Sequence, residues 1–316
     1  MQEKKDALPA DFLERLIRIL GEDDARQAVA AMSEPRRTSF RVNTLKADLS
    51  LVQELERAGL HPTHLPFLET AFSVPPEERD VLLNSEIYRR NLIYVQSASS
   101  MIPALALDPQ PSEAILDLTA APGSKTLQMA AMMNNCGEIA AVEIVRERFY
   151  RMNALLREYG AENVRTFLRN GMTVWRHRPD HFDRVLLDAP CSSEGRFEAA
   201  EPETYAYWSL RKIREMQRKQ RKLLYSAVRS LRPGGVLVYS TCSFAPEENE
   251  LVLTELLRNF EDVTVEPLGV EVTSMRSALA RWEGKSFDPR LGRHARRIVP
   301  DGLFEGFFVA RLRKRG

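Results

Sequence analysis

The sequence predicts an α/β fold in which a smaller N-terminal α+β domain precedes a mostly parallel sheet with helices on both faces. From Tyr94 onward, short apolar runs alternate with stretches of helical length and periodicity, as strand–helix–strand connections require. Two cysteines and a glycine-containing turn directly follow such runs, which places them at the carboxyl edge of the sheet, where ligands bind. We expect two domains, residues 1–93 and 94–316.

The N-terminal domain begins with helical periodicity. Residues from about 8 to 33 predict two short amphipathic helices, and one face of the first carries Phe12, Leu13, Leu16, Ile17 and Leu20. Residues 39–45 alternate like a strand, and Asp48 or Ser50 is suited to cap a helix that ends near Gly59.

The second domain contains seven predicted strands. They span residues 114–118, 139–144, 164–168, 185–188, 236–240, 263–265 and 307–312, with helices of 10 to 20 residues between them. One helix is expected over residues 146–160, where glycine is a natural stop, and another over residues 210–231 before Pro233-Gly234-Gly235.

Composition limits the classes of protein. The three cysteines form no CxxC pair, so neither a zinc site nor a disulfide scaffold is expected, and a reducing, cytoplasmic setting fits best. The start, Met1 to Asp6, is charged and has no apolar segment behind it, so no signal peptide is expected. The absence of an 18-residue apolar stretch argues against a membrane span.

The turn Pro122-Gly123-Ser124-Lys125 lies between a predicted strand and a predicted helix. A P-loop would need glycines where Thr119 and Ser124 stand, and a dinucleotide fingerprint would need three glycines, of which only Gly123 is present. Glu143 ends the next strand, where a carboxylate can accept both hydroxyls of a ribose. S-adenosylmethionine fits this layout, and we expect it to contact Thr119, Ala120, Ala121, Pro122, Gly123, Ser124, Lys125, Glu143, Asn170 and Asp188.

Each of two further strands ends in a cysteine motif. Cys191 stands in Asp-Ala-Pro-Cys-Ser after one strand, and Cys242 stands in Ser-Thr-Cys-Ser after another. A thiolate that adds to C6 of cytosine turns C5 into a nucleophile able to accept a methyl group. This chemistry also needs a nearby acid, a lowered cysteine pKa, and a base that later removes the C5 proton. The residues alone do not say which cysteine attacks.

The chain resembles the Sun/Nop family of RNA (cytosine-5-)-methyltransferases. Matching segments run in family order: Arg41-Val42-Asn43-Thr44, Tyr94-Val95-Gln96-Ser97, Asp117 to Thr126, Asp188 to Ser192, Pro233-Gly234-Gly235, Ser240 to Ser243, and Arg297 with Pro300 and Gly306-Phe307-Phe308. The resemblance implies a Rossmann-like class I methyltransferase sheet that uses S-adenosylmethionine.

The resemblance also implies roles for individual residues. Cys242 would be the nucleophile, Cys191 would release the product, and Lys125 and Asp188 would line the target base. Two departures are Thr119 in place of the usual cysteine and Ser124 in place of the usual second glycine. An RNA substrate is expected, with rRNA favoured over tRNA, and the N-terminal domain, residues 1–93, is expected to contact it.

Three rival functions make different demands on the sequence. An inactive RNA-binding or ribosome-assembly protein would be favoured by loss of Cys242, Asp188 or Glu143, and all three are present. A DNA cytosine methyltransferase would lack the Thr-Cys segment, which is present here as Thr241-Cys242. A cysteine hydrolase would need a histidine partner, and all five histidines lie outside the two cysteine motifs.

Basic residues are clustered although the net charge is only +1. Seven of them lie between Arg211 and Lys222, with Glu215 as the single acid. Arg214, Arg218 and Arg221 fall on one side of the expected helix. Further groups lie at 290–297 and 311–315. Such clusters suit a polyanion, although solvated helix faces would look the same.

Overall fold

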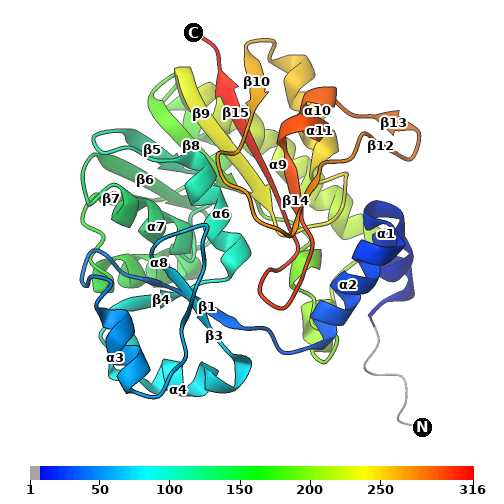
Figure 1. The fold of residues 1–316 in the computed structure, drawn as a ribbon. Helices are drawn as coiled ribbons and strands as arrows, with labels where there is room; N and C mark the ends of the chain where they lie inside the picture. The colour runs from blue at the N-terminus through cyan, green and yellow to red at the C-terminus, as the bar shows by residue number, and fades with distance from the viewer. Residues whose placement is uncertain (1–7) are drawn as a thin grey trace.

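A nine-stranded sheet forms the centre of the computed structural model, which describes residues 8–316 (Figure 1). Five neighbouring strands are parallel, in the order β9-β8-β5-β6-β7. Four others extend the sheet beyond β9: β15 is antiparallel to β9, β10 and β14 pair with β15, and β11 pairs with β14. The bounds are β5 Ala114–Asp117, β6 Glu138–Glu143, β7 Val164–Leu168, β8 Phe182–Asp188, β9 Leu231–Thr241, β10 Val263–Glu266, β11 Met275–Ser277, β14 Arg296–Ile298 and β15 Phe307–Lys314. All seven predicted strands are therefore confirmed, while β11 and β14 were not predicted.

Helices cover both faces of this sheet, as predicted. Helices α6 (Ala98–Leu107), α7 (Ser124–Met132) and α8 (Arg146–Glu158) pack on one face through residues such as Met101, Met129 and Met152. Helices α9 (Leu210–Ser230) and α10 (Glu250–Asn259) pack on the other through Leu224 and Leu253. The short α11 (Pro289–His294) joins the same side.

Two of the expected helices are absent from the described chain. Between β7 and β8 the structure has only a 3-10 segment, η2 (Gly171–Arg176), and between β10 and β15 the one helix is the six-residue α11. The expectation of helices of 10 to 20 residues between all strands was therefore wrong. Gly171 and Pro179 bracket η2, and neither favours the interior of a longer helix.

The N-terminal region occupies two separate places (Figure 1). Helices α1 (Ala10–Leu20) and α2 (Glu22–Ser33) pack beside Phe197 and Phe244 of the large domain, with the Phe12 and Phe197 ring centroids 4.9 Å apart. Phe12 and Leu16 are buried as predicted. Ile17 is 47% exposed and Ile19 is buried instead, so the predicted face was wrong toward the end of the helix.

A small antiparallel sheet, in the order β2-β3-β1-β4, forms the other N-terminal part. Its bounds are β1 Thr38–Val42, β2 Thr63–His64, β3 Ala71–Val74 and β4 Ile93–Val95, with the short helices α3 Leu51–Arg57, α4 Arg79–Asn84 and α5 Glu86–Arg89 against it. Ser50 precedes α3 but makes no side-chain cap, whereas the Asp48 carboxylate accepts the Ser50 N–H at 2.8 Å.

Two of the matched motifs join the small sheet to the large one. The Arg41 Nε donates to Gln96 Oε1 at 2.9 Å, and Gln96 Nε2 donates to Gln128 Oε1 of α7 at 3.1 Å. Asn43 Nδ2 donates to the Tyr159 carbonyl at 2.9 Å. These buried polar side chains connect the small sheet to helices α7 and α8, which cover the large sheet. The predicted boundary after residue 93 falls within β4. The division into residues 1–93 and 94–316 stays a prediction.

Within residues 8–316, no helix combines the length and the apolar character needed to cross a bilayer. The segment Met1 to Asp6, on which the expectation of no signal peptide was based, lies outside the described residues.

Candidate active site

A cavity of about 580 Å³ opens at the carboxyl edge of the parallel strands. All the expected cofactor residues except Gly123 line it, and so do both motif cysteines. Strands β5, β6, β8 and β9 bring these residues together because parallel neighbours end at the same edge. The volume is within the range of about 300–1,000 Å³ found for small-molecule sites.

Gly123 shapes the turn at the start of α7 without lining the cavity. Its φ of +108° lies in the region that L-residues avoid, and a Cβ there would come within 3.2 Å of Met152 Cγ. The turn thus presents the start of α7 to the cavity, where unpaired N–H groups can meet a ligand. Thr119 Oγ1 donates to the Asp188 carbonyl at 2.8 Å, so this departure from the family pattern ties the turn to β8.

Glu143 ends β6 and lies in the cavity wall with only 4% of its surface exposed. Its Oε1 accepts the Val145 N–H at 2.7 Å, and Oε2 lies 3.6 Å from an Arg148 guanidinium nitrogen. The carboxylate is therefore held in place while it faces the cavity. The Asn170 side-chain oxygen accepts the Met172 N–H at 3.0 Å and so caps η2 beside it.

Lys125 and Asp188 form an ion pair inside the cavity, with Nζ and Oδ2 2.7 Å apart. Lys125 Nζ also donates to Ser100 Oγ at 2.6 Å, and Ser240 Oγ donates to Asp188 Oδ1 at 2.7 Å. The two charged groups are thereby fixed in orientation at the ends of α7 and β8. Phe307 lies next to them, 5.8 Å from the Lys125 nitrogen to the ring centroid.

The two motif cysteines meet across the strand ends. Cys191 Sγ and Cys242 Sγ are 3.2 Å apart, and both thiols are free. The hydrogen bond from Cys191, helped by the positive charge of Arg196, lowers the pKa of Cys242 to about 7 against the opposing effect of burial. The same hydrogen bond, together with burial, raises the pKa of Cys191. These opposite shifts favour Cys242 as the thiolate of the pair and Cys191 as its proton donor, an order that the residues alone left open.

A close backbone approach fixes the loop that carries Arg196. Gly195 N donates to the Cys242 carbonyl at 2.9 Å, and Gly306 N donates to the Gly195 carbonyl at 3.1 Å. A Cβ on Gly195 would lie only 1.9 Å from the Gly306 carbonyl oxygen, so the approach requires glycine. The Arg196 guanidinium is thus held close enough to the Cys242 thiolate to act on its pKa.

Several residues of this site were not among the predicted ones, namely Ser100, Arg148, Arg196, Ser240 and Phe307. Ser240 belongs to the Ser-Thr-Cys-Ser motif and Phe307 to a matched segment, so position within a motif was a usable signal for both. Arg196 carries no such signal, because it reaches Cys242 only through the folded loop.

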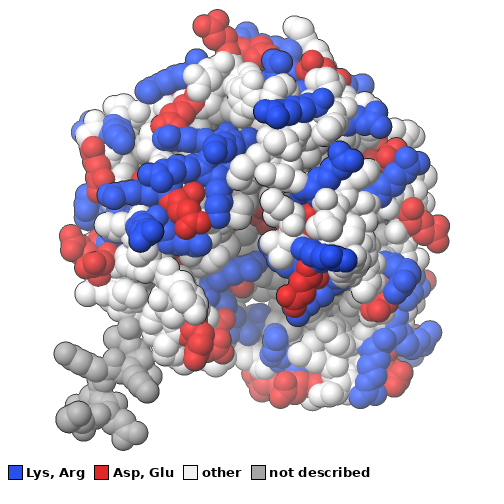
Figure 2. All heavy atoms as spheres, turned by 180° about the vertical axis from the view of Figure 1, so that it is seen from behind, with Lys and Arg blue, Asp and Glu red and all other residues white. Residues whose placement is uncertain are grey.

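The basic residues of α9 divide into two groups. Arg221 pairs with Glu255 at 2.5 Å, and Lys219 pairs with Glu215 at 2.7 Å. Within the described chain no ion pair is found for Arg211, Arg214, Arg218 or Lys222, which follow one another along the exposed side of the helix. Figure 2, seen from behind, shows a broad gathering of basic side chains on this side of the molecule.

Comparisons with known proteins agree with this geometry. The model of the family 16S rRNA methyltransferase RsmB/F matches residues 104–313, and that of the N-terminal domain of 16S rRNA methyltransferase RsmF matches residues 8–98. The tRNA (cytosine(49)-C(5))-methyltransferase of Pyrococcus abyssi is 38% identical over 300 residues, covering 92% of this chain and 93% of that protein. The ribosomal RNA small subunit methyltransferase F of Vibrio vulnificus (strain YJ016) is 39% identical over 316 residues. This chain covers 64% of its length, and the match covers 97% of this chain.

A solved structure is similar over the whole chain as well. The methyltransferase homolog protein from Pyrococcus horikoshii superposes with a TM-score of 0.81 and 33% identity, covering 97% of this chain and 100% of that one. The NSun6 structure from the same organism, titled as determined with SFG, has a TM-score of 0.80 at 23% identity and so shares the fold. With a family model matched over most of its length, the chain belongs to the RsmB/F family of 16S rRNA methyltransferases, the Sun/Nop family that the sequence motifs indicated.

Proposed function

We propose that the protein transfers a methyl group from S-adenosylmethionine to C5 of a cytosine in RNA through a covalent bond between Cys242 and C6. The observation that carries this proposal is the approach of the two thiols, 3.2 Å apart, in the same cavity as the Lys125–Asp188 pair. Addition to C6 requires a thiolate at near-neutral pH, and a second sulfur beside it is placed to take part in release.

The residues of the cavity suit S-adenosylmethionine. The Gly123 turn brings backbone close to a ligand, and the buried Glu143 carboxylate offers a fixed acceptor for the two hydroxyls of a ribose. Asn170 and the exposed apolar side chains of Ile144 and Val145 border the same space and suit an adenine. The bound cofactor would supply the methyl group.

The protein's own groups then account for the remaining chemistry. The Cys242 sulfur bonds to C6 while Lys125 and Asp188 hold the edge of the base, and C5 gains the electron density with which it takes the methyl group. Once Cys242 is bonded to C6, the neighbouring negative charge that helped to keep the proton on Cys191 is gone, so Cys191 can release that proton to water. The Cys191 thiolate next removes the C5 proton, whose electron pair restores the C5–C6 double bond and expels the Cys242 thiolate. The cytosine must be unpaired or flipped out of a helix to reach these sulfurs.

We propose rRNA as the substrate class. Both family models describe 16S rRNA methyltransferases, and small-subunit rRNA methyltransferases are among the similar proteins. This chain spans 64% of the length of the Vibrio rRNA methyltransferase, whereas it covers 93% of the tRNA methyltransferase. A tRNA target is therefore the alternative that the experiment must separate.

Bisulfite sequencing of total RNA from cells with and without the gene tests this proposal. We expect one or a few protected cytosines of small-subunit rRNA to become reactive when the gene is deleted, and to be restored by the wild-type gene but not by Cys242→Ala. Loss of protection in tRNA alone would move the substrate class to tRNA. Unchanged protection in all RNA would favour an inactive assembly protein.

A further inference from the structure

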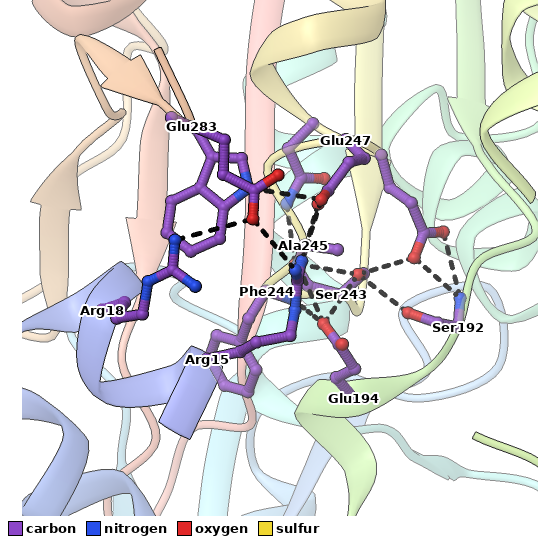
Figure 3. A network of polar contacts seen from close by, with 12 residues as sticks. Arg15, Arg18, Ser192, Glu194, Ser243, Phe244, Ala245, Glu247 and Glu283 are labelled. Atoms are coloured by element: carbon purple, nitrogen blue, oxygen red, sulfur yellow. Dashed lines mark hydrogen bonds and ion pairs between the residues drawn. The ribbon is translucent and has the colours of Figure 1, made fainter. Parts of the chain in front are cut away.

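A buried polar network includes the residues that directly follow the two cysteines in the chain, and Figure 3 shows part of it. Ser192 and Ser243 each follow one of the cysteines, and their Oγ atoms are 2.9 Å apart. Figure 3 shows Ser243 between Ser192 and the Glu194 carboxylate. Two glutamates, Glu194 and Glu248, contact this pair and are 2% and 0% exposed. Nothing in the chemistry described above uses this network.

Glu194 is surrounded by hydrogen-bond donors. Its Oε2 accepts the backbone N–H groups of Phe244 and Ala245, each at 2.9 Å, and its Oε1 accepts the Trp208 indole N–H at 2.8 Å. These three N–H groups all donate to the carboxylate, and an ionised carboxylate accepts such hydrogen bonds without a proton of its own. Glu194 therefore fits the charged form.

Glu248 has fewer donors. The Ser192 N–H lies 3.1 Å from Oε2 and 3.3 Å from Oε1, and Gln220 Nε2 donates to Oε2 at 2.8 Å. Oε1 also faces Ser243 Oγ at 2.9 Å. Glu248 thus meets Ser243 through the oxygen whose one N–H contact is the longer branch of a shared hydrogen bond.

The count of protons around Ser243 decides between the forms. Its Oγ lies 3.1 Å from Glu194 Oε2 and 2.9 Å from Glu248 Oε1, but the hydroxyl has one proton to donate. If both carboxylates were ionised, one of these two buried oxygen–oxygen contacts would hold no proton, which is costly. A proton on Glu248 resolves this: Glu248 donates to Ser243, and Ser243 donates to Glu194.

We propose that Glu248 is protonated in the active enzyme and that the chain Glu248–Ser243–Glu194 positions the loops of Cys191 and Cys242 against each other. Glu248 holds the Cys191 loop through the Ser192 N–H, and Glu194 holds the Cys242 loop through the N–H groups of Phe244 and Ala245. These are positioning residues, since they act through the serines beside the thiols.

The surroundings of Glu248 agree with the neutral form. Burial, together with the charge of Glu194, raises the pKa of Glu248 to about 8. The other ionisable groups that face it are the thiol of Cys191 and Tyr239 of β9, whose hydroxyl donates to the Glu248 carbonyl at 2.6 Å, while α9 contributes only the uncharged Gln220. Burial raises the pKa of Glu194 as well, but its hydrogen-bond donors and the charge of Arg15 of α1 oppose that rise. Arg15 itself binds Glu247 at 2.8 Å.

Glutamine substitutions distinguish the two carboxyl groups. In Glu248→Gln the amide donates to Ser243 as the acid did, so we expect this variant to recover most of the activity that Glu248→Ala loses. In Glu194→Gln the amide NH₂ group would face N–H donors that an oxygen accepts in the wild type, so we expect at least a tenfold loss of activity. Glu247→Gln is the matched control, since Glu247 is the adjacent residue but binds Arg15 and Trp282 instead of the serines.

Two measurements are made on each purified, folded variant. The first is the rate of Cys242 alkylation by iodoacetamide from pH 5 to 10, followed by peptide mass spectrometry, which needs no RNA. We expect at least tenfold slower alkylation at pH 7 in Glu194→Gln and Glu248→Ala, and rates within threefold of wild type in Glu248→Gln and Glu247→Gln. The second is methyl transfer to RNA, which rests on the proposed function. We expect wild-type methyl transfer to fall above pH about 8 as Glu248 ionises, and Glu248→Gln to remain active there.

If Glu194→Gln keeps the wild-type rates of alkylation and methyl transfer while Glu248→Gln loses at least tenfold in both, the proton lies on Glu194 and the proposal is overturned. Equal rates in all variants would overturn it as well. If Glu194→Gln does not fold, Ser243→Ala replaces it. We expect Ser243→Ala to slow Cys242 alkylation tenfold as well, and an unchanged alkylation rate in that variant would overturn the proposal. The expected alkylation pattern without RNA methylation would refute the proposed function and leave this inference standing.

Discussion

Replacing Cys191 by alanine tests the division of labour between the thiols. The Cys191 hydrogen bond is the largest of the effects that hold the pKa of Cys242 at about 7, so its removal moves that pKa toward the ordinary value of 9.0. At pH 7 the thiolate fraction would fall from about one half to as little as ~1%, up to ~50-fold. Arg196 still favours the thiolate, so we expect a loss between three- and fifty-fold.

The same substitution removes the group that releases the product. Cys191→Ala should therefore form a denaturant-resistant adduct with RNA slowly at pH 7 and faster near pH 9, and it should not turn over. Cys191→Ser is the control, because its hydroxyl keeps a donor beside Cys242. The adduct is measured by denaturing gel electrophoresis with labelled RNA, and the pKa of Cys242 by the pH dependence of alkylation.

Two results would refute this reasoning. An adduct with Cys242→Ala but not with Cys191→Ala would reverse the roles of the cysteines. An unchanged midpoint of Cys242 alkylation in Cys191→Ala would show that the Cys191 thiol, 3.2 Å away, does not set the pKa.

Three further predictions follow from the same structure. Glu143→Ala should weaken S-adenosylmethionine binding by about ten- to a hundredfold, the cost of removing a charge-assisted hydrogen bond, and unchanged affinity by calorimetry in a folded variant would exclude the ribose interaction. Replacing Arg211, Arg214 and Arg218 by glutamine should lower the salt slope of RNA binding by roughly 0.7–0.9 for each phosphate that is no longer neutralised, with cofactor affinity unchanged; filter binding with an unaltered slope would leave α9 as a solvated surface. Arg221 is left out because Glu255 already pairs with it. Because the folded-state pKa of Glu248, about 8, lies above the ordinary 4.5, its contribution to stability is complete below pH 4.5 and declines as pH rises through 8. The free energy of unfolding, measured with urea, should show this decline, which can reach ~1.4 kcal/mol per pH unit. The decline should be smaller in Glu248→Gln, and an equal dependence of the unfolding free energy on pH in wild type and variant would contradict the prediction.

The sequence by itself determined the large sheet and the edge at which its site lies. Apolar runs, glycine stops and the motifs at the strand ends are local signals, and parallel strands bring their carboxyl ends together whatever the details of packing. That is why Cys191, Cys242, Asp188 and Glu143 could be assigned to one cavity before any distance between them was known. The same local signals failed where the packing of one element against another determines which side chains are buried, as for the exposed Ile17 of α1.

Only the tertiary structure decided the chemical state of the site. The difference between the pKa values of the two thiols depends on their mutual hydrogen bond and on Arg196, which reaches Cys242 because Gly195 and Gly306 let two loops touch. The assignment of a proton to Glu248 depends on Ser243 and on donors from separate loops and helices. Such properties arise from burial and from interactions between residues far apart in the chain, and a pattern of neighbouring residues carries no record of either.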